Sequence, residues 1–372
     1  MRFADIIGNE SAKTRLRNMI DADRIPHALL IHGAKGTGKL ALARAAAQYI
    51  HCTCRTGGEP CGKCPSCRQH QSFNHADTFF SFPIIKKKGA TISDDYIAQW
   101  REFLTGNPVE SYQRWLSEIG AENSQPMIYV TESESILHKM SFASYTAKYK
   151  VLIMWLPEKM NDECANKLLK MLEEPFLDSL FILVSENPKD IIATILSRTQ
   201  QLELKKLSTQ EVAQYLQQRY SLNPKDALAV AAPADGDITL AEENLALDGE
   251  NKDFFQQFTT LMRKAYARDL KGLKKWSEEI QGYKREKTQR FLRYCSRMVR
   301  ENYIYNLRTP ELNYLNTAEE QFSQRFAPFI NEGNVERIMA ELESAETDIQ
   351  GNANPRITLF DLAIKMTIQI RR

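Results

Sequence analysis

The sequence lacks the features that mark several classes of protein. Its 372 residues carry 49 Lys and Arg against 47 Asp and Glu, a net charge of +2, which excludes a strongly basic nucleic-acid arm or an acidic tail as the main feature. Apolar runs are short: residues 151–156 form one of the longest, whereas a membrane span needs ~20. Met1 to Asp5 show no apolar stretch typical of a signal peptide. We therefore expect a cytoplasmic protein without membrane contact.

Disulfide bonds are not expected either. Seven cysteines in a cytosolic chain of this length do not suggest a disulfide framework, and five of them lie between Cys52 and Cys67, which points to a metal. The hydrophobic content of 43% and the charged content of 26% are ordinary for a globular protein. At roughly 150 residues per domain, the length predicts two or three domains.

The first half of the chain alternates short β-rich runs with helical patterns, which is typical of an α/β domain. Several of the expected strands are continuously apolar, as in a parallel sheet that is buried on both faces. The clearest strands are residues 28–32, 127–130, 151–155 and 180–184. Beyond about Leu204 the spacing of apolar residues is helical.

This pattern divides the chain into an α/β domain at 1–205, a small helical domain at 206–248 and a helical domain at 249–372. The segment 86–124 interrupts the α/β alternation, and we interpret it as an insertion with two surface helices, at 99–104 and 112–119. It opens with three lysines, Lys86 to Lys88, which form a solvated loop or, alternatively, a DNA contact.

The segment from Gly33 to Lys39 has the pattern G-x-x-x-x-G-K between an expected strand and an expected helix. In that context the backbone N–H groups of the loop bind phosphate oxygens, and the lysine reaches the β- and γ-phosphates. The alternative is a glycine-rich turn without a ligand, but the flanking strand and helix favour a phosphate loop. The candidate nucleotide-binding residues are Gly33, Gly36, Gly38 and Lys39.

Three groups that ATP hydrolysis requires are missing from this phosphate loop and its surroundings. Position 40 needs a hydroxyl to bind Mg²⁺, and Leu40 has none. The strand that should end with an acid for Mg²⁺ and a Glu that polarises water ends with Trp155 and Leu156. Glu158 follows, but it is better interpreted as part of the loop to the next helix. The sequence therefore predicts a nucleotide-binding fold that performs no ATP chemistry, with ATP binding itself doubtful.

The cysteine-rich segment 52–67 has the spacing C-x8-C-x2-C-x2-C. Two overlapping C-x-x-C steps place thiolates around one tetrahedral centre, and Cys52 supplies the fourth sulfur. We expect a structural Zn²⁺ site, because a closed four-thiolate shell leaves no open position for catalysis. Cys54 is a competing fourth ligand, and free thiols or an iron–sulfur cluster are the alternatives to zinc. The candidate ligands are Cys52, Cys61, Cys64 and Cys67.

These features, in this order, resemble the bacterial DNA polymerase III clamp-loader family, a branch of the AAA+ proteins, and most closely its delta-prime members. The resemblance covers about the first 200 residues; the C-terminal third matches only in helical character and length. It is carried by the degenerate phosphate loop, the four-cysteine segment, and residues 3–8, 26–30, 166–175 and 194–198. The segment 86–124 is longer than the family leads us to expect.

The resemblance implies a RecA-like parallel sheet in an AAA+ domain at 1–205, a helical lid at 206–248 and an oligomerisation collar at 249–372. It implies a subunit that hydrolyses no ATP and acts within a complex. The partners would be clamp-loader ATPase subunits and a delta subunit, with the sliding clamp and primed DNA reached through the complex. The family motif Ser-Arg-Cys reads Ser197-Arg198-Thr199 here.

The resemblance also implies that Arg198 acts as an arginine finger, which reaches the ATP site of a neighbouring subunit. A guanidinium is always charged and stabilises charge on the γ-phosphate. An ordinary surface arginine is the alternative. A second set of arginines recurs at helical spacing and lies on one helix face, which is either solvated or a site for an acidic partner or DNA phosphate. These are Arg290, Arg293, Arg297 and Arg300.

Two other functions stay open at the level of sequence. One is an ATP-hydrolysing clamp-loader subunit of the gamma/tau kind, or another AAA+ ATPase, with atypical metal ligation through Glu158 or Glu173. The other is a zinc-bearing nucleic-acid-binding protein outside replication. ATP turnover by the purified chain would favour the first of these, and isolation of the native complex would distinguish the second.

Overall fold

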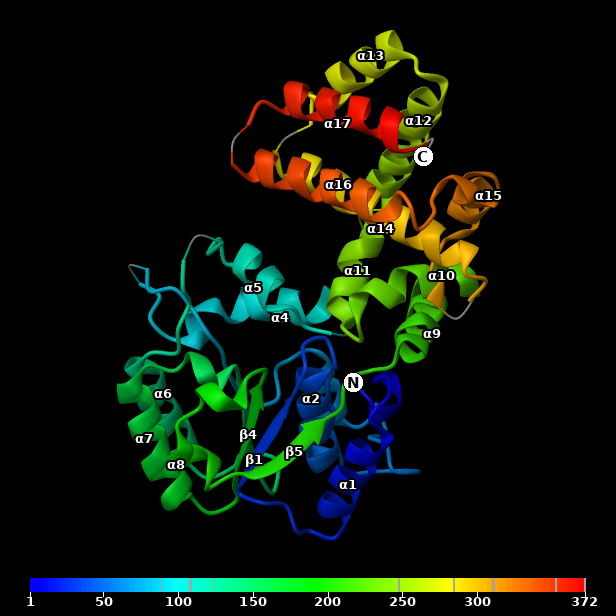
Figure 1. The fold of residues 1–372 in the computed structure, drawn as a ribbon. Coiled ribbons are helices and arrows are strands. Elements are labelled where there is room, and N and C mark those ends of the chain that lie inside the picture. Colours follow the sequence, from blue (N-terminus) through cyan, green and yellow to red (C-terminus); the bar gives the residue numbers. More distant parts are fainter. Residues whose placement is uncertain are drawn as a thin grey trace. The chain divides into compact units, whose positions relative to one another are not determined.

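The computed structural model describes residues 1–87, 89–106, 109–122, 124–246, 248–283, 285–309, 312–351 and 353–370 (Figure 1). The chain forms two compact units. Unit 1 comprises Met1–Tyr215 and Ala234–Ala241, and unit 2 comprises Leu216–Pro233 and Glu242–Arg372. The domain boundaries expected at 205 and 248 stay predictions. Within the described ranges, no helix has both the length and the hydropathy to cross a membrane.

Unit 1 contains a five-stranded sheet in the order β2-β3-β4-β1-β5, and all four pairings of neighbouring strands are parallel. Every residue of β3 and of β4 is buried, as the continuous apolar runs predicted. The strands are β1 Ala28–Gly33, β2 Thr78–Ser81, β3 Lys150–Trp155, β4 Ser179–Ser185 and β5 Gln200–Leu204. This sheet, with the helical unit that follows it in the chain, confirms the predicted fold class.

Alternate residues along each strand face two different helical layers, because successive side chains point to opposite sides of a sheet. Leu29 and Ile31 pack in one core with α1 (Glu10–Asp21) and α2 (Lys39–His51). Leu30 and Leu183 pack in a second core with α6 (Val130–Ser141), α7 (Asp162–Glu173) and α8 (Ala193–Leu196). Figure 1 shows these two groups of helices on opposite faces of the sheet. The strand ends that carry the candidate site therefore lie in a sheet that is covered on both faces.

The helices of unit 1 follow the amphipathic patterns of the sequence. In α7, for example, the side chain of Asn161 accepts the N–H of Cys164 and so caps the first turn, and Ala165, Leu168 and Leu172 are buried. The helices are α1 Glu10–Asp21, α2 Lys39–His51, α3 Pro65–Gln71, α4 Ile97–Gly106, α5 Tyr112–Glu118, α6 Val130–Ser141, α7 Asp162–Glu173 and α8 Ala193–Leu196, with 3₁₀ turns at Phe3–Asp5, Ser93–Tyr96, Pro157–Lys159 and Pro188–Asp190.

The described residues of unit 2 form helices and connecting turns around one apolar core, in which Trp276, Phe291 and Leu342 are fully buried. The boundary between the units passes through α9 and α11. The helices from this point on are α9 Thr209–Tyr220, α10 Pro224–Ala231, α11 Ile238–Ala246, α12 Asp248–Ala267, α13 Leu270–Ile280, α14 Arg285–Asn306, α15 Thr317–Phe326, α16 Val335–Gln350 and α17 Pro355–Gln369, with 3₁₀ turns at Ala232–Ala234 and Ala327–Phe329.

The prediction of a strand at 127–130 is wrong. Met127 and Ile128 each form a single bridge, to Ile84 and to Met160, and Val130 already begins α6. The apolar run is real and Ile128 is buried. A short apolar run does not by itself distinguish a strand from the residues that lead into a helix, and here the helical period that follows determines the structure.

Two strands of the sheet, β2 and β5, were not among the four expected strands. β2 has only four residues, and it lies at one edge of the sheet. β5 lies at the other edge, where only Leu202 and Leu204 of its five residues are buried. Edge strands carry polar residues and are short, so neither produces a continuous apolar run.

The two helices expected in the segment 86–124 are present as α4 and α5, but they are not merely surface helices. Trp100 and Trp115 are fully buried in the same core as α2, and their ring centroids lie 5.1 Å apart. The Glu110 carboxylate accepts a hydrogen bond from the Arg44 guanidinium of α2 at 2.8 Å; the Glu110 side chain is buried, and that of Arg44 is 10% exposed. Lys88 lies outside the described residues. The segment is therefore anchored on the helix that begins at the phosphate loop.

Candidate phosphate loop and metal centre

The candidate phosphate loop connects the end of β1 to the first residue of α2. Its backbone needs glycine at two close approaches. At Gly33 a Cβ would collide with the Leu204 carbonyl oxygen, and at Gly36 (φ +66°) with the Asp237 carboxylate. The N–H of Ile238 also donates to the Gly36 oxygen at 3.3 Å. The loop is thus packed between β5 and the segment Ala234–Ala241, which belongs to the same unit.

Lys39 is buried, with 6% of its surface exposed, and its ammonium group donates to the Ala34 carbonyl oxygen within the loop. The Thr37 hydroxyl donates to the same oxygen at 2.9 Å. Burial lowers the pKa of Lys39, and the charges of Glu186 and Glu158 act against this effect. The lysine therefore lies folded into the loop, with acidic groups close enough to act on its charge.

The positions that would bind and use Mg²⁺ are filled by apolar side chains. Leu40 is 2% exposed and packs in the core on the α2 side of the sheet. Trp155 and Leu156 are equally buried, and the ring of Trp155 lies 5.4 Å from that of Trp100. None of these three side chains offers an oxygen to a metal ion.

Glu158 lies in the 3₁₀ turn after β3, where its Oε1 accepts the N–H groups of Glu186 at 2.8 Å and of Asn187 at 3.2 Å. Burial raises the pKa of this carboxyl group, although the N–H donors oppose the shift. Its charge acts on Lys39. Of the two acids considered for atypical metal ligation, Glu158 is therefore the one that the structure connects to the phosphate loop.

Arg198 lies two residues after α8, on the turn that leads into β5. Its guanidinium donates to the Thr194 carbonyl oxygen at 3.0 Å and forms an ion pair with Glu173 Oε1 at 2.7 Å. The Ser197 hydroxyl lies 3.3 Å away. The side chain is 36% exposed. Arg198 and Glu173, two residues singled out in the sequence for different roles, are therefore partners within the chain.

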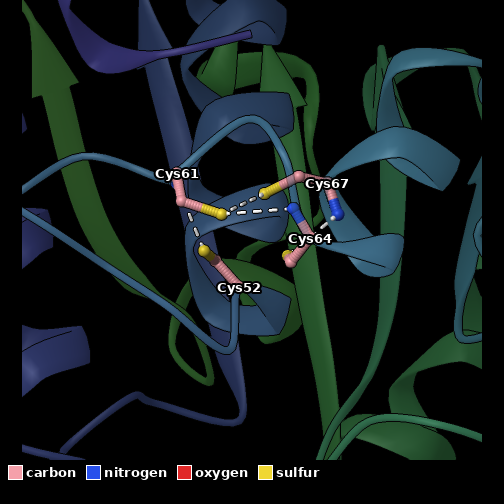
Figure 2. Close-up of side chains that lie close together, drawn as sticks. All are labelled: Cys52, Cys61, Cys64 and Cys67. Carbon is pink, nitrogen blue, oxygen red and sulfur yellow. Dashed lines mark hydrogen bonds between the residues drawn. The ribbon is translucent and has the colours of Figure 1, made fainter.

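The four candidate metal ligands converge on one point, as Figure 2 shows. The sulfur atoms of Cys52, Cys61, Cys64 and Cys67 all lie within 4.8 Å of one another. Cys52 follows α2, Cys64 caps the first turn of α3, and Cys67 lies within α3. Cys54 is exposed and lies outside this group, next to the Thr53 hydroxyl. The structure thus brings Cys52, not Cys54, to the other three sulfurs.

The backbone around the cysteines is arranged to stabilise thiolates. The N–H of Cys61 donates to the sulfur of Cys52 at 3.3 Å, and the N–H of Cys64 to that of Cys61 at 3.4 Å (Figure 2). Although burial acts in the opposite direction, N–H donors from Cys67 and Thr53 lower the pKa of the Cys64 thiol to about 6. A soft donor set of four converging sulfurs fits a metal ion.

The side chain of Glu59 attaches the cysteine segment to the beginning of the chain. Glu59 accepts the backbone N–H groups of Phe3 at 2.8 Å and of Ala4 at 3.0 Å, and it also accepts the Arg17 guanidinium at 2.8 Å. The sequence offered no pattern that predicts this role. The cysteine segment is therefore tied to the first residues of the chain and to α1.

A second group of metal-binding side chain types lies beside the cysteines and was not predicted. One ring nitrogen from each of His51, His70 and His75 lies within 4.8 Å of the others. Burial lowers the pKa of His51 to about 3 and that of His70 to about 2, so both rings are neutral near pH 7. The only signal in the sequence is that three of its six histidines fall within residues 51–75.

The four arginines of α14 each meet a carboxylate of the same unit. Arg290 pairs with Glu250 at 2.8 Å and Arg293 with Glu346 at 2.7 Å. The other two pairs are Arg297 with Glu319, and Arg300 with Glu301. The helix face that could have been a phosphate site is thus neutralised within the chain.

Comparison with known proteins places residues 8–208 in a family described as "DNA polymerase III, delta subunit". The chain is similar to the DNA polymerase III subunit delta' of Bacillus subtilis, with 30% identity over 197 residues, which cover 53% of this chain and 47% of the relative. It is also similar to the subunit tau of Salmonella typhimurium, with 26% identity over 241 residues, which cover 63% and 31%.

Among solved structures, the chain is similar to a DNA polymerase III gamma subunit-related protein from Thermotoga maritima, with a TM-score of 0.40 and 11% identity, covering 97% of this chain and 100% of that chain. The chain spans about a third of the tau relative and about half of the delta' relative.

Proposed function

We infer the function from one premise: the chain belongs to the clamp-loader family of DNA polymerase III and is delta-prime-like. We propose that it is a subunit that hydrolyses no ATP and helps its complex to load the sliding clamp onto primed DNA in replication. Its partners would be the ATPase subunits and the delta subunit of the complex. One observation carries the proposal: Leu40, Trp155 and Leu156 fill the positions at which an ATPase needs oxygen ligands.

The retained phosphate loop fits this role. The backbone N–H groups of the loop and Lys39 are positioned by β1 and α2. The loop therefore keeps its conformation even though the side chains that would bind Mg²⁺ are missing. The purified chain should show no ATP turnover above background. Turnover that Lys39→Ala abolishes would overturn the proposal, because only an intrinsic phosphate site would respond to that change.

We further propose that Arg198 serves a neighbouring ATPase subunit in trans. A guanidinium that is partly exposed and held by one carboxylate can exchange that partner for a phosphate group. In that case Glu173 is the group that holds Arg198 within the isolated chain. The contribution of such a finger to turnover is large, on the order of 10³-fold or more where it has been isolated.

Two variants distinguish this role from a structural one in the reconstituted complex. Arg198→Ala should lower ATP turnover by at least about tenfold, whereas Glu173→Ala removes the same ion pair and should leave turnover unchanged or higher. Arg15→Ala, a change at an exposed arginine of α1, is the matched control for loss of positive charge. Equal losses in the Arg198 and Glu173 variants would mean that the pair is structural, and an unaffected Arg198 variant would exclude the finger.

The cysteine centre is proposed to hold Zn²⁺ in a structural role. Four thiolates close the coordination shell, which leaves no position for a substrate, and the site lies at the far end of α2 from the phosphate loop. Metal analysis of the purified chain tests the identity of the ion, and iron in place of zinc would overturn this assignment.

A second candidate is an ATP-hydrolysing subunit of the gamma/tau kind. The observation that favours it is the buried Glu158 carboxylate, whose charge acts on Lys39 of the phosphate loop. In this case Mg²⁺-dependent turnover by the purified chain would be lost in Glu158→Gln and kept in Glu173→Gln.

A further inference from the structure

Three histidines from separate elements meet in the interior of unit 1. His51 is the last residue of α2, His70 lies in α3, and His75 lies in the connection between α3 and β2. Their ring centroids are 5.1 Å apart for His51 and His70, 4.3 Å for His51 and His75, and 4.5 Å for His70 and His75. His51 and His75 are each 5% exposed. Three imidazoles are thus gathered in a buried place that no role described so far requires.

The rings are oriented by contacts on their outer edges. His51 Nε2 lies 2.9 Å from the Tyr149 carbonyl oxygen, which can only accept, so Nε2 carries the proton and Nδ1 keeps its lone pair. That Nδ1 lies 2.9 Å from Nε2 of His70. Hydrogen bonds of this kind to a carbonyl group fix the tautomer and the orientation of histidines that bind metals.

The ring of His75 is held on both edges. Its Nε2 lies 3.0 Å from the Ser66 hydroxyl, and its Nδ1 accepts the N–H of Asp77 at 3.2 Å. Binding of a metal ion would replace one of these contacts, as it would replace the hydrogen bond between His51 and His70. The polar partners needed to orient three ligands are therefore already present around the group.

We propose that His51, His70 and His75 form a second metal site, which binds a divalent transition-metal ion, Zn²⁺ in the first place, through three imidazole nitrogens. With Zn–N bonds of about 2.0–2.1 Å, the nitrogens of a tetrahedral site lie roughly 3.4 Å apart. The 2.9 Å between the facing nitrogens of His51 and His70 is close to this separation. The ring of His75 is stacked on those of His51 and His70, so it has to rotate to direct a nitrogen at the same ion.

The donor set determines which ions fit. Asp77, the nearest acid in the sequence, is fully engaged elsewhere: its carboxylate accepts the N–H groups of Tyr145, Thr146 and Ala147, and the Thr146 hydroxyl. The site therefore offers neutral nitrogen ligands, which suit Zn²⁺, Cu²⁺ or Ni²⁺ and not Mg²⁺ or Ca²⁺. Three protein ligands leave a fourth position to water or to the Thr78 hydroxyl, which lies 3.3 Å from His51 Nδ1.

The two groups share the elements that position them. His51 is followed directly by Cys52, and His70 lies one helical turn after Cys67 in α3. An ion bound by the four cysteines would therefore fix α3 against the end of α2 and bring the histidines into place. The alternative is a stack of neutral imidazoles linked by hydrogen bonds, and it predicts a metal at the cysteines alone.

The count of metal ions in the full chain separates these two cases. The chain would be freed of metal with a chelator, reloaded with Zn²⁺ and desalted, and its metal content would be measured by elemental mass spectrometry. We expect about two zinc ions per chain and about one in His70→Gln, with the thiolate site intact. His70 is the least buried of the three, and His138→Gln, at an exposed histidine of α6, is the matched control and should keep both ions.

Replacement of Zn²⁺ by Co²⁺ shows which site is lost. The strong sulfur-to-cobalt absorption should be unchanged in His70→Gln, while the amount of cobalt bound falls by about half. Equal metal content in the unchanged chain and in His70→Gln would overturn the proposal. If that variant does not fold, the unchanged chain still decides: zinc-loaded protein that takes up no second ion on titration with Ni²⁺ or Zn²⁺ excludes the site.

Discussion

Helix α2 has a candidate binding site at each end, and the two ends differ in what their side chains can bind. At its beginning, the glycine-rich loop and Lys39 keep the shape of a phosphate site, but Leu40 is buried where a hydroxyl would be needed. At its end, Cys52 joins three other cysteines whose sulfur atoms converge within 4.8 Å. The same helix is thus deprived of metal ligands at one end and supplied with them at the other.

The difference shows that the two requirements of a phosphate loop are physically separable. Backbone N–H groups at a helix N-terminus are set by the fold, whereas the Mg²⁺ ligands depend on individual side chains. Replacement of those side chains by Leu40 and Trp155 adds apolar packing to the core of unit 1. The loop therefore contributes to packing even without Mg²⁺ ligands, whereas the cysteine end brings four possible metal ligands together.

The largest effect is expected when the cysteine end loses a ligand. Cys64→Ser should lower the zinc content by at least about one ion per chain and the midpoint of thermal unfolding by more than about 10 °C, because metal binding is coupled to the folding of such segments. Elemental analysis and calorimetry measure the two quantities.

The matched control for this change is Cys54→Ser, since Cys54 is exposed and lies outside the cluster. Its zinc content and unfolding midpoint should equal those of the unchanged chain. Loss of zinc in Cys54→Ser together with its retention in Cys52→Ser would show that the fourth ligand had been assigned wrongly.

A smaller effect is expected at the beginning of α2. Leu40→Ala should lower the free energy of unfolding by about 2–5 kcal/mol, because it leaves a cavity in the core. Leu40→Thr restores the hydroxyl but buries it, so we expect a comparable loss of stability and no ATP turnover. Denaturation in urea and a turnover assay provide the measurements.

Leu137→Ala is the control for this pair, because Leu137 lies in α6 with 47% of its surface exposed. Its stability should change by no more than about 0.5 kcal/mol. Mg²⁺-dependent ATP turnover in Leu40→Thr would remove the distinction between the two ends of the helix, since a single hydroxyl would then have restored the lost chemistry.

The smallest effect is expected for Lys39→Met, which should change the free energy of unfolding at pH 7 by no more than about 1 kcal/mol. Burial lowers the pKa of Lys39, so above that lowered value the unfolded chain binds more protons than the folded chain. The stability of the unchanged chain relative to Lys39→Met should therefore rise as the pH is raised towards the ordinary lysine value of about 10.4. A stability difference that falls over this range would show that the folded state raises the pKa of Lys39 and does not lower it.

The sequence predicted those parts of unit 1 in which one side chain pattern determines the structure. Continuous apolar runs identified β1, β3 and β4, because both faces of these strands are covered. The spacing of the cysteines predicted which four sulfur atoms converge, because four ligands around one point constrain the positions in the chain. By contrast, the run 127–130 was too short to separate a strand from the start of α6.

What the sequence could not predict depends on partners that are distant along the chain. The spacing of the arginines of α14 left open a solvated face or a site for an acidic partner or DNA phosphate, and it did not reveal that Glu250 and Glu346 neutralise two of them. The spacing of His51, His70 and His75 follows no helical or strand period, so only the packing of α2 against α3 reveals that they meet. Arg198 likewise gave no sign of its pairing with Glu173.

Glu59 links the cysteine segment to the amino-terminal residues by hydrogen bonds. Its carboxylate accepts the amides of Phe3 and Ala4, and it stands two positions before Cys61. If the ion is removed, this anchor loosens, and the first turn of the chain loses the acceptor for two of its N–H groups. Proteolytic trimming at that end, and faster deuterium uptake by those amides, would then report the metallation state of the protein without any direct assay of the ion.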